Sequence, residues 1–185
     1  MLDRRAFVTA LPAVLGAVDL AAQGNGLPDG ARVPKLEFVY ECDATLSDAL
    51  PFGRTLDGTR RVIPITGGRV EGPRIRGHLV AGGFDWNLSR SDGASSVDAS
   101  YYMRTDDGVI IRITNRGVGG HPAETSRGRT GRADAATETF LMFTTPSFET
   151  PVGQYDWLTR STFVGTLGVR ANTRGAVLIR VFRVV

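Results

Sequence analysis

RRVIPITGGRVEGPRIRGHLVAGGFDWNL, residues 60–88, sets glycine pairs and single glycines between short runs that are rich in β-branched residues. Glycine at this density inside strand-like sequence indicates bulges, tight corners or close backbone approach. Such corners allow a sheet to curl into a closed barrel. The segment ends on Asp85-Trp86, and a polar–aromatic pair after the last corner is a candidate for a site inside that barrel.

Beyond residue 34 the sequence has almost no 3.6-residue apolar period. Apolar and polar residues alternate instead, most clearly in 97–104, as in half-buried strands. Asp107-Gly108 predicts a two-residue hairpin turn, and 154–158 a single helical turn. The expected strands are 36–42, 61–65, 74–80, 84–89, 96–105, 109–115, 139–144, 162–170 and 175–184. The sequence therefore predicts an all-β fold, a single antiparallel β-barrel with little helix.

The first 22 residues have the order of an export signal, with Arg4-Arg5, an apolar run over 10–18 and a cleavage point after Ala22. The arginine pair followed by Phe7 is similar to a twin-arginine signal, which exports folded proteins. A buried N-terminal helix of a cytoplasmic protein is the alternative. We expect a signal peptide over 1–22, a flexible tether over 23–33, a barrel domain over 34–185, and a periplasmic or secreted protein that meets the membrane only through its signal.

Charge gives no sign of a nucleic-acid partner. The formal net charge is +3, and most arginines are spread along the strands, as on solvated faces. The one cluster is Arg127, Arg129 and Arg132, in a loop over 119–136 that has no aromatic residue to stack on bases. Nucleic-acid binding is therefore not expected.

Motifs for metal or cofactor chemistry are also missing. Cys42, the only cysteine, lies in strand-like sequence, which favours a small buried core residue over a nucleophile. His78 and His121 lack the spacing of metal ligands. The sequence contains no phosphate loop, dinucleotide fingerprint or nucleophile elbow. No metal and no cofactor are expected.

Four motifs in a fixed order make the chain recognisable: GRTLDGTRRVIPITGGRVEGPRIRGHLVAGGFDW, YYMRTDDGVIIRITNRG, PSFET and YDWLTRSTFVG. Together they resemble domain-of-unknown-function family 3237, over residues 34–185. The resemblance implies a lipocalin-like barrel and no particular reaction. One departure is Thr159, where the family pattern usually has Asn after Trp-Leu.

Candidates for catalysis inside the barrel are Asp85, one of two adjacent tyrosines, and Arg104. A buried Asp85 beside Trp86 would have a raised pKa, which suits a general base or acid; alternatively, it accepts backbone N–H bonds at the Gly82-Gly83 bulge. Tyr101 or Tyr102 could donate to a developing oxyanion, although only one of the two can face inward. Arg104 could hold a ligand carboxylate, or it is an ordinary exposed arginine.

Further residues are candidates for binding a ligand. Trp86 and Trp157 would provide an apolar lining, whereas Glu149 and Tyr155 would help to close one mouth of the barrel. His78 stands on a strand as a ligand contact or as a structural histidine. Each of these side chains also has an ordinary structural interpretation as packing, capping or solvated surface.

Two functions are compatible with these residues. The first is a cofactor-free lyase, isomerase or cyclase that acts on a small apolar or aromatic molecule, with Asp85 as the acid or base. The second is a non-catalytic periplasmic carrier for such a molecule. The last strand, 175–185, is apolar on both faces, so we also expect a homo-oligomer, most simply a homodimer.

Overall fold

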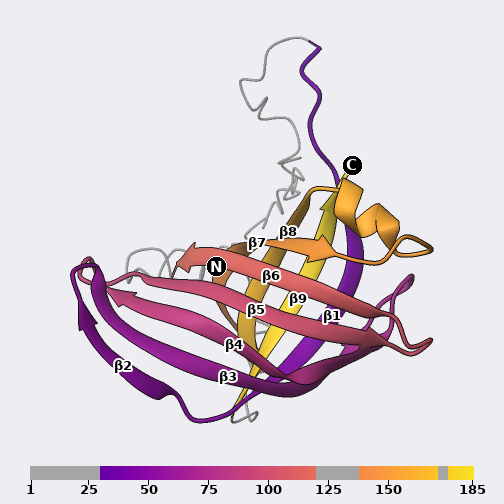
Figure 1. Cartoon of the computed structure of the whole chain (residues 1–185). Helices are drawn as coiled ribbons and strands as arrows, with labels where there is room; N and C mark the ends of the chain where they lie inside the picture. Colours follow the sequence, from indigo (N-terminus) through magenta and orange to yellow (C-terminus); the bar gives the residue numbers. More distant parts are fainter. Residues whose placement is uncertain (1–29, 120–137, 171–174) are drawn as a thin grey trace, which may run out of the picture. The chain divides into compact units, whose positions relative to one another are not determined.

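One antiparallel sheet closes on itself in the computed structural model, which describes residues 30–119, 138–170 and 175–185. Its strands follow the order β1-β9-β8-β7-β6-β5-β4-β3-β2, and β1 also pairs with β3, so that eight strands form a closed barrel with β2 alongside (Figure 1). The strands are β1 (Leu36–Leu46), β2 (Leu50–Thr55), β3 (Gly58–Glu71), β4 (Gly77–Arg90), β5 (Ser95–Thr105), β6 (Ile110–Gly119), β7 (Glu138–Glu149), β8 (Phe163–Arg170) and β9 (Ala176–Val184). The described residues contain one short 3-10 helix, η2 (Asp156–Arg160). The predicted all-β barrel with little helix is confirmed.

Closure depends on β3, which changes partner along its length. Its first part pairs with β2, and its last part pairs with β1 from Leu46↔Ile65 to Glu41↔Glu71. Gly68 lies in this second part, where a Cβ atom would come within 2.5 Å of the Asp43 carbonyl oxygen. Only glycine permits such an approach, so this corner glycine has the role that the sequence predicts.

The Gly82-Gly83 pair forms a bulge within one continuous strand. The pairing of β4 with β5 passes from Val80↔Tyr102 to Phe84↔Ser100, so β4 carries extra residues. The sequence prediction of two separate strands here was wrong, because a bulge bends a strand without ending it. Beside the bulge, a Cβ atom at Gly83 would lie 2.4 Å from the Cβ of Tyr101.

Two other sequence expectations need correction. The strand β2 was not predicted, because its sequence LPFGRT contains proline and glycine, which usually mark turns. The hairpin at Asp107-Gly108 exists, but its loop has three residues rather than two. Thr105 N–H donates to Val109 O and Gly108 N–H to Thr105 O, and Gly108 has a positive φ of 93°, as in a type I turn followed by a left-handed residue.

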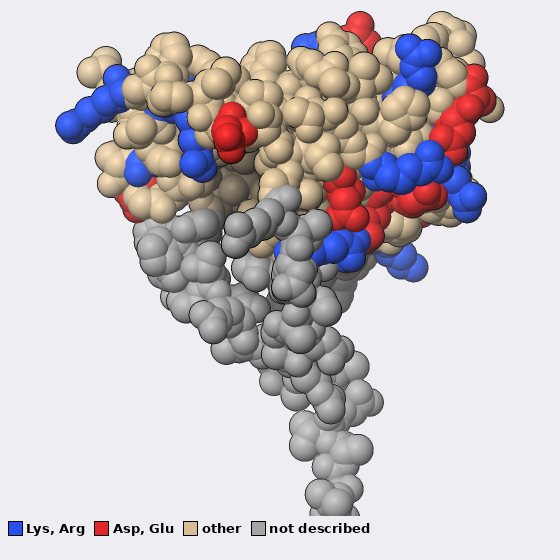
Figure 2. Space-filling view, turned by 90° about the horizontal axis from the view of Figure 1, so that it is seen from below, with Lys and Arg blue, Asp and Glu red and all other residues tan. Residues whose placement is uncertain are grey.

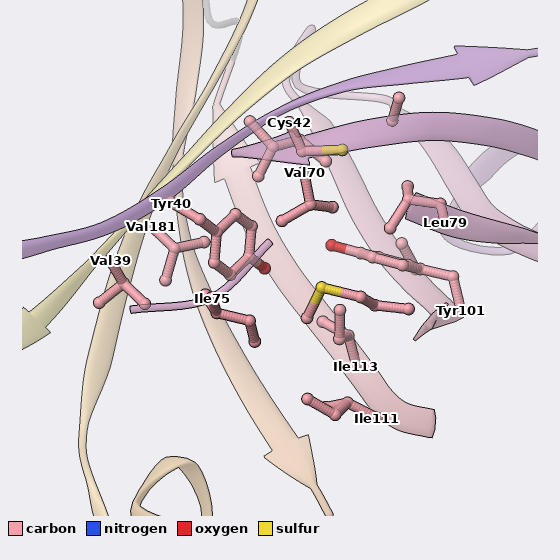
Figure 3. Close-up of a cluster of buried hydrophobic side chains, with 14 of the residues drawn as sticks. Val39, Tyr40, Cys42, Val70, Ile75, Leu79, Tyr101, Ile111, Ile113 and Val181 are labelled. Atoms are coloured by element: carbon pink, nitrogen blue, oxygen red, sulfur yellow. The ribbon is translucent and has the colours of Figure 1, made fainter. Parts of the chain in front are cut away.

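Side chains fill one end of the barrel, where the β3–β4, β5–β6 and β7–β8 connections lie. We call this the filled end. Its buried cluster includes Leu158 from η2 and Met103 from β5. Ile75 from the β3–β4 connection and Ile111 and Ile113 from β6 belong to the same cluster (Figure 3). The predicted helical turn therefore exists, slightly later than expected, and its Leu158 helps to fill this end.

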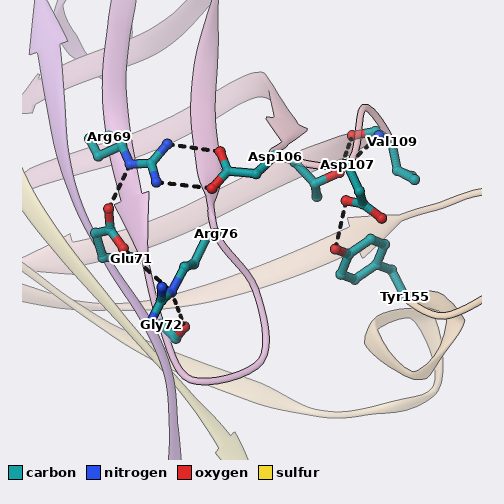
Figure 4. A network of polar contacts seen from close by, with 9 residues as sticks. Arg69, Glu71, Gly72, Arg76, Asp106, Asp107, Val109 and Tyr155 are labelled. Carbon is teal, nitrogen blue, oxygen red and sulfur yellow. Dashed lines mark hydrogen bonds and ion pairs between the residues drawn. The ribbon is translucent and has the colours of Figure 1, made fainter.

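A polar network lies on the surface of the filled end. Arg69 binds Asp106 through two hydrogen bonds of 2.8 and 3.0 Å, and also donates to Glu71 (Figure 4). The Tyr155 hydroxyl donates to Asp107 at 2.9 Å, which ties the segment before η2 to the β5–β6 turn. The Arg69, Asp106 and Glu71 side chains are exposed, so each of their contacts contributes little to stability by itself.

Acidic and basic side chains are mixed on the face that Figure 2 shows, without a large area of one sign. The predicted signal over 1–22 and the arginines at 127, 129 and 132 lie outside the described residues. Among the residues that are described, no helix is both long and apolar enough to cross a membrane.

The apolar last strand is covered within the single chain. Every residue from Ala176 to Val184 is buried or half-buried, and Leu178 and Ile179 are both almost fully buried. The strand therefore has no exposed apolar face of the kind on which the expected homodimer was argued. The homo-oligomer stays a prediction, without this support.

Candidate functional site

The other end of the barrel holds a cavity of about 320 Å³, and we call this the hollow end. Its walls are mostly aliphatic, with Ile63, Ile65, Val97, Ala99, Leu141, Met142, Leu167, Val177 and Ile179 among them. Six lining residues are polar: Arg61, Asp85, Asn87, Ser95, Tyr101 and Asn115. An apolar cavity with a few polar groups is the usual form of a small-molecule site.

Asp85 is the one carboxylate in this wall, and it is only 9% exposed. One carboxylate oxygen accepts a hydrogen bond from Asn87 Nδ2 at 3.1 Å, and the other accepts from the Asp98 backbone N–H at 2.9 Å. Arg61 Nε donates to Asn87 Oδ1 at 2.9 Å. Asn87 therefore connects the partly exposed arginine to the buried carboxylate.

These contacts also join two strands. The pairing of β4 with β5 passes from Asp85↔Ala99 to Leu88↔Ser96. Between these pairs, the Asp85 carboxylate receives the Asp98 N–H, and Asn87 Nδ2 donates to Ser96 O at 3.4 Å. The sequence offered a contact with the Gly82-Gly83 bulge as the alternative role of Asp85. The structure places its backbone contact on the neighbouring strand instead.

Burial raises the pKa of Asp85 above its usual value of 3.8. The hydrogen bonds from Asp98 and Asn87 and the positive charge of Arg61 offset part of this rise, because they stabilise the ionised form. A carboxyl with a raised pKa facing an apolar cavity can hold a proton and pass it to a bound molecule more readily than an exposed aspartate can.

Tyr101 is the tyrosine that faces inward. It is 2% exposed, and burial raises the pKa of its hydroxyl. Figure 3 shows the hydroxyls of Tyr101 and Tyr40 pointing toward one another in the core. Tyr101 therefore forms the floor of the cavity, at the boundary between the hollow end and the filled end.

Four predicted residues lie on the outside of the barrel. Tyr102 and Arg104 are exposed because they alternate with the inward-facing Tyr101 and Met103 along β5. His78 is exposed for the same reason on β4. Trp86 is half-buried on the outer face, where its ring contacts Phe52 at a centroid distance of 4.9 Å. None of the four lines the cavity.

The remaining predicted residues belong to the filled end. Trp157 and Tyr155 pack against the buried core as partly buried side chains, and Trp157 also lies under the Arg74 guanidinium. Glu149 is exposed and pairs with Arg112 at 3.3 Å. The two aromatic residues thus pack at the end of the barrel opposite the cavity, and neither lines it.

Sequence reasoning missed Asn87 and Asn115, which are buried, and Arg61 and Ser95, which are not. The signal for Asn87 was available, because a residue two positions after Asp85 faces the same side of a strand. Asn115 carries no comparable local signal, since it is brought to the site by the pairing of β6 with β5. Among the residues that the structure describes, no three His, Cys, Asp or Glu side chains gather as metal ligands.

The barrel and its cavity can now be set beside known proteins. A family described as "Protein of unknown function (DUF3237)" matches residues 34–184. A UPF0311 protein of Rhodopseudomonas palustris is 33% identical over 142 residues, which cover 75% of this chain and 92% of that protein. The crystal structure of a conserved protein of unknown function from the same organism has a TM-score of 0.70 at 30% identity, over 84% of this chain and 100% of the other.

One relative has a named activity. The hydroalkoxylation enzyme phnH of Penicillium herquei is 24% identical over 133 residues, which cover 72% of this chain and 74% of that enzyme. A crystal structure of an enzyme from Penicillium herquei has a TM-score of 0.62 at 21% identity, over 86% of this chain and 100% of the other, and this likeness shows a shared fold. The match over residues 34–184 and the 33% identity to the Rhodopseudomonas palustris protein establish that this chain belongs to the DUF3237 family.

Proposed function

We propose that this chain is an exported barrel protein that binds a small, largely apolar or aromatic molecule and catalyses a proton transfer on it through Asp85, without a cofactor. The observation that carries the proposal is a buried carboxyl with a raised pKa in the wall of an otherwise mostly aliphatic cavity. Perturbed carboxyls in such cavities are typical acid and base groups.

The relative named as a hydroalkoxylation enzyme supports a cyclase within this class. Intramolecular hydroalkoxylation adds an O–H bond across a carbon–carbon double bond, so that one C–O bond and one C–H bond form while the O–H bond and the π bond of the alkene break. Protonated Asp85 would deliver its proton to the alkene carbon, and its carboxylate would recover the hydroxyl proton. The carboxyl ends as it began, so the reaction requires no other reactant.

Arg61 and Asn87 would act as positioning residues. Asn87 holds one Asp85 oxygen at 3.1 Å, and Arg61 fixes the orientation of the Asn87 amide. The second Asp85 oxygen accepts from the Asp98 N–H, and Asp85 lines the cavity. The surrounding aliphatic side chains would exclude water from a reacting cation or enol.

A non-catalytic carrier is the second candidate, and one observation favours it. The Asp85 and Asn87 side chains supply hydrogen bonds between β4 and β5 where the Asp85↔Ala99 and Leu88↔Ser96 pairs leave a gap. That role would require an acidic residue at this position even in a protein that performs no reaction.

Incubation with a panel of unsaturated alcohols and alkenyl phenols tests the proposal. The expected result is an isomer of unchanged mass, separated by chromatography, with turnover that falls on the order of a hundredfold in Asp85→Asn. Arg104→Ala, an exposed substitution on the outer face, is the matched control and should keep full turnover. Binding to the wild type without any product would favour the carrier, and failure of every compound to bind would contradict both candidates.

A further inference from the structure

A basic side chain lies at the mouth of the cavity. Three residues of β3 line the cavity in turn: Ile65, Ile63 and Arg61. Ile65 is buried, Ile63 is half-buried and Arg61 is exposed. Alternate residues of a strand face the same side, so this row runs from the interior of the barrel to solvent. Arg61 is its outermost member.

The strand register places Arg61 above Asp85 in the wall. On the neighbouring strand, Arg61 pairs with Asn87 and Ile63 pairs with Asp85. Arg61 is therefore one inward-facing position nearer the mouth than Asp85, which is about 7 Å along the strand. A ligand group that binds Arg61 leaves the rest of the molecule to reach Asp85 from the side of the mouth.

The Arg61 guanidinium is held on one side only. Its Nε donates to Asn87 Oδ1 at 2.9 Å, and its two terminal nitrogens have no hydrogen-bond partner among the described residues. Their N–H groups form a planar fork that fits the two oxygens of a carboxylate. Most of the other described arginines already pair with an acidic side chain: Arg69, Arg74, Arg76, Arg90, Arg112, Arg116, Arg160, Arg170, Arg180 and Arg183.

The charges of the cavity favour an anionic group at this position. Of the described residues that line the cavity, only Arg61 and Asp85 have charged side chains. The proposed reaction begins with a protonated, uncharged Asp85, and in that state the positive charge of Arg61 has no counterpart in the wall. A ligand anion beside Arg61 would supply the counterpart. Its negative charge would also favour the protonated form of Asp85.

We infer that Arg61 forms a subsite at the cavity mouth for a carboxylate, so that the ligand is a small apolar or aromatic carboxylic acid. The carboxylate lies toward solvent and the apolar body lies in the cavity beside Asp85. The inference rests on the proposed function, since it names the class of molecule that would reach Asp85. It also gives the ligand one orientation, because only one end of the molecule carries the charge.

Three naphthalene probes of similar size test the subsite: 2-naphthoate, 2-naphthamide and 2-naphthylmethylammonium, which differ in charge. Each is titrated into the full-length protein by calorimetry at neutral pH. We expect 2-naphthoate to bind at least about tenfold more tightly than 2-naphthamide, and the ammonium compound to bind most weakly. Equal affinity of 2-naphthoate and 2-naphthamide would overturn the inference while leaving the proposed function in place. Failure of all three probes to bind would contradict the proposed function and the inference with it.

Variants assign the preference to the Arg61 charge. Arg61→Met should reduce the preference for 2-naphthoate over 2-naphthamide to about twofold or less, while the affinity for 2-naphthamide changes by less than about threefold. Arg61→Gln should do the same although its amide can still donate to Asn87, which separates the loss of charge from the loss of that contact.

Arg60→Met is the matched control. It removes the same charge from the adjacent residue, whose guanidinium lies 5.1 Å from the centre of the Trp86 ring and does not line the cavity. This variant should keep the preference for 2-naphthoate. Retention of the tenfold preference in both Arg61 variants would overturn the inference, and so would an equal loss of preference in Arg60→Met.

Discussion

Asp85 is subject to opposing effects, because its contacts stabilise the ionised carboxylate while its burial destabilises it. The Asp98 N–H, the Asn87 amide and the charge of Arg61 all favour the ionised form. Burial has the larger effect and raises the pKa. The Asp85 side chain is therefore held in place by hydrogen bonds from Asn87 and Asp98, and it can still take up a proton.

Replacement of Asp85 by asparagine separates these effects. The new side chain can still accept the Asp98 N–H, but its own NH₂ group would then face Asn87 Nδ2. One buried hydrogen bond is lost, so we expect the free energy of unfolding to fall by about 1–3 kcal/mol. Urea denaturation measures this change, and a stability equal to that of the wild type would contradict the bridging role of Asp85.

The pH dependence of stability provides a second prediction at this residue. The pKa of Asp85 is higher in the folded chain than the usual 3.8, so the folded state binds the proton more tightly than the unfolded state does. The stabilisation that protonation of Asp85 provides is therefore complete below pH 3.8, and it is lost as the pH rises through the pKa of Asp85 in the folded chain. The free energy of unfolding of the wild type, relative to that of Asp85→Asn, should decline from pH 3.8 up to this pKa and stay level at higher pH. A difference that increases with pH would contradict the prediction.

At the scale of the strand, the bulge in β4 fixes the position of the cavity floor. Gly83 lets β4 approach Tyr101 so closely that a Cβ atom would lie 2.4 Å from the Cβ of Tyr101. Gly83→Ala must therefore displace Tyr101, and we expect a loss of about 1–3 kcal/mol, as for other overpacked sites. The exposed Ala81→Ser is the control from the same bulge. Equal melting temperatures for the two variants would show that the floor adjusts without cost.

Strand patterns explain how much of the site could be predicted from the sequence. The glycine pair correctly indicated a bulge, and Asp85 after it does face the cavity. Alternation shows that Tyr101 and Tyr102 face opposite sides, and Tyr101 shares its side with the apolar residues Ala99 and Met103, which are buried in the structure. Asn115 could not be found locally, since the pairing of β5 with β6 brings it level with Asp85.

At the scale of the whole barrel, the filled end contributes most to stability, whereas the hollow end holds the cavity for a ligand. Ile113 is fully buried at the filled end, so Ile113→Ala should lower the free energy of unfolding by about 2–5 kcal/mol. Ala99→Leu adds bulk to the cavity wall instead, and should abolish binding of the alkenyl phenols with a smaller change in stability. Denaturation and calorimetry on both variants test this separation, and strong destabilisation by Ala99→Leu would contradict it.

We predict that the protein is exported from the cytoplasm through its first 22 residues. If Arg4-Arg5 forms a twin-arginine signal, as its position before the apolar run over 10–18 indicates, then replacement of both arginines by lysine should keep the protein in the cytoplasm. Fractionation of cells with an antibody against the barrel measures this. An unchanged distribution of the variant would contradict the twin-arginine route.

The separation of the two ends also affects how such a protein can diverge. Wall positions outside the buried core cluster, such as Ile63, Val97 and Leu141, can change without disturbing the packing of the filled end, so they are constrained by ligand preference more than by folding. Lineages could therefore explore new substrates through neutral drift of the cavity wall, each intermediate remaining folded. A barrel built in this way is a suitable starting point for directed evolution, in which libraries randomise the wall and keep the filled end constant.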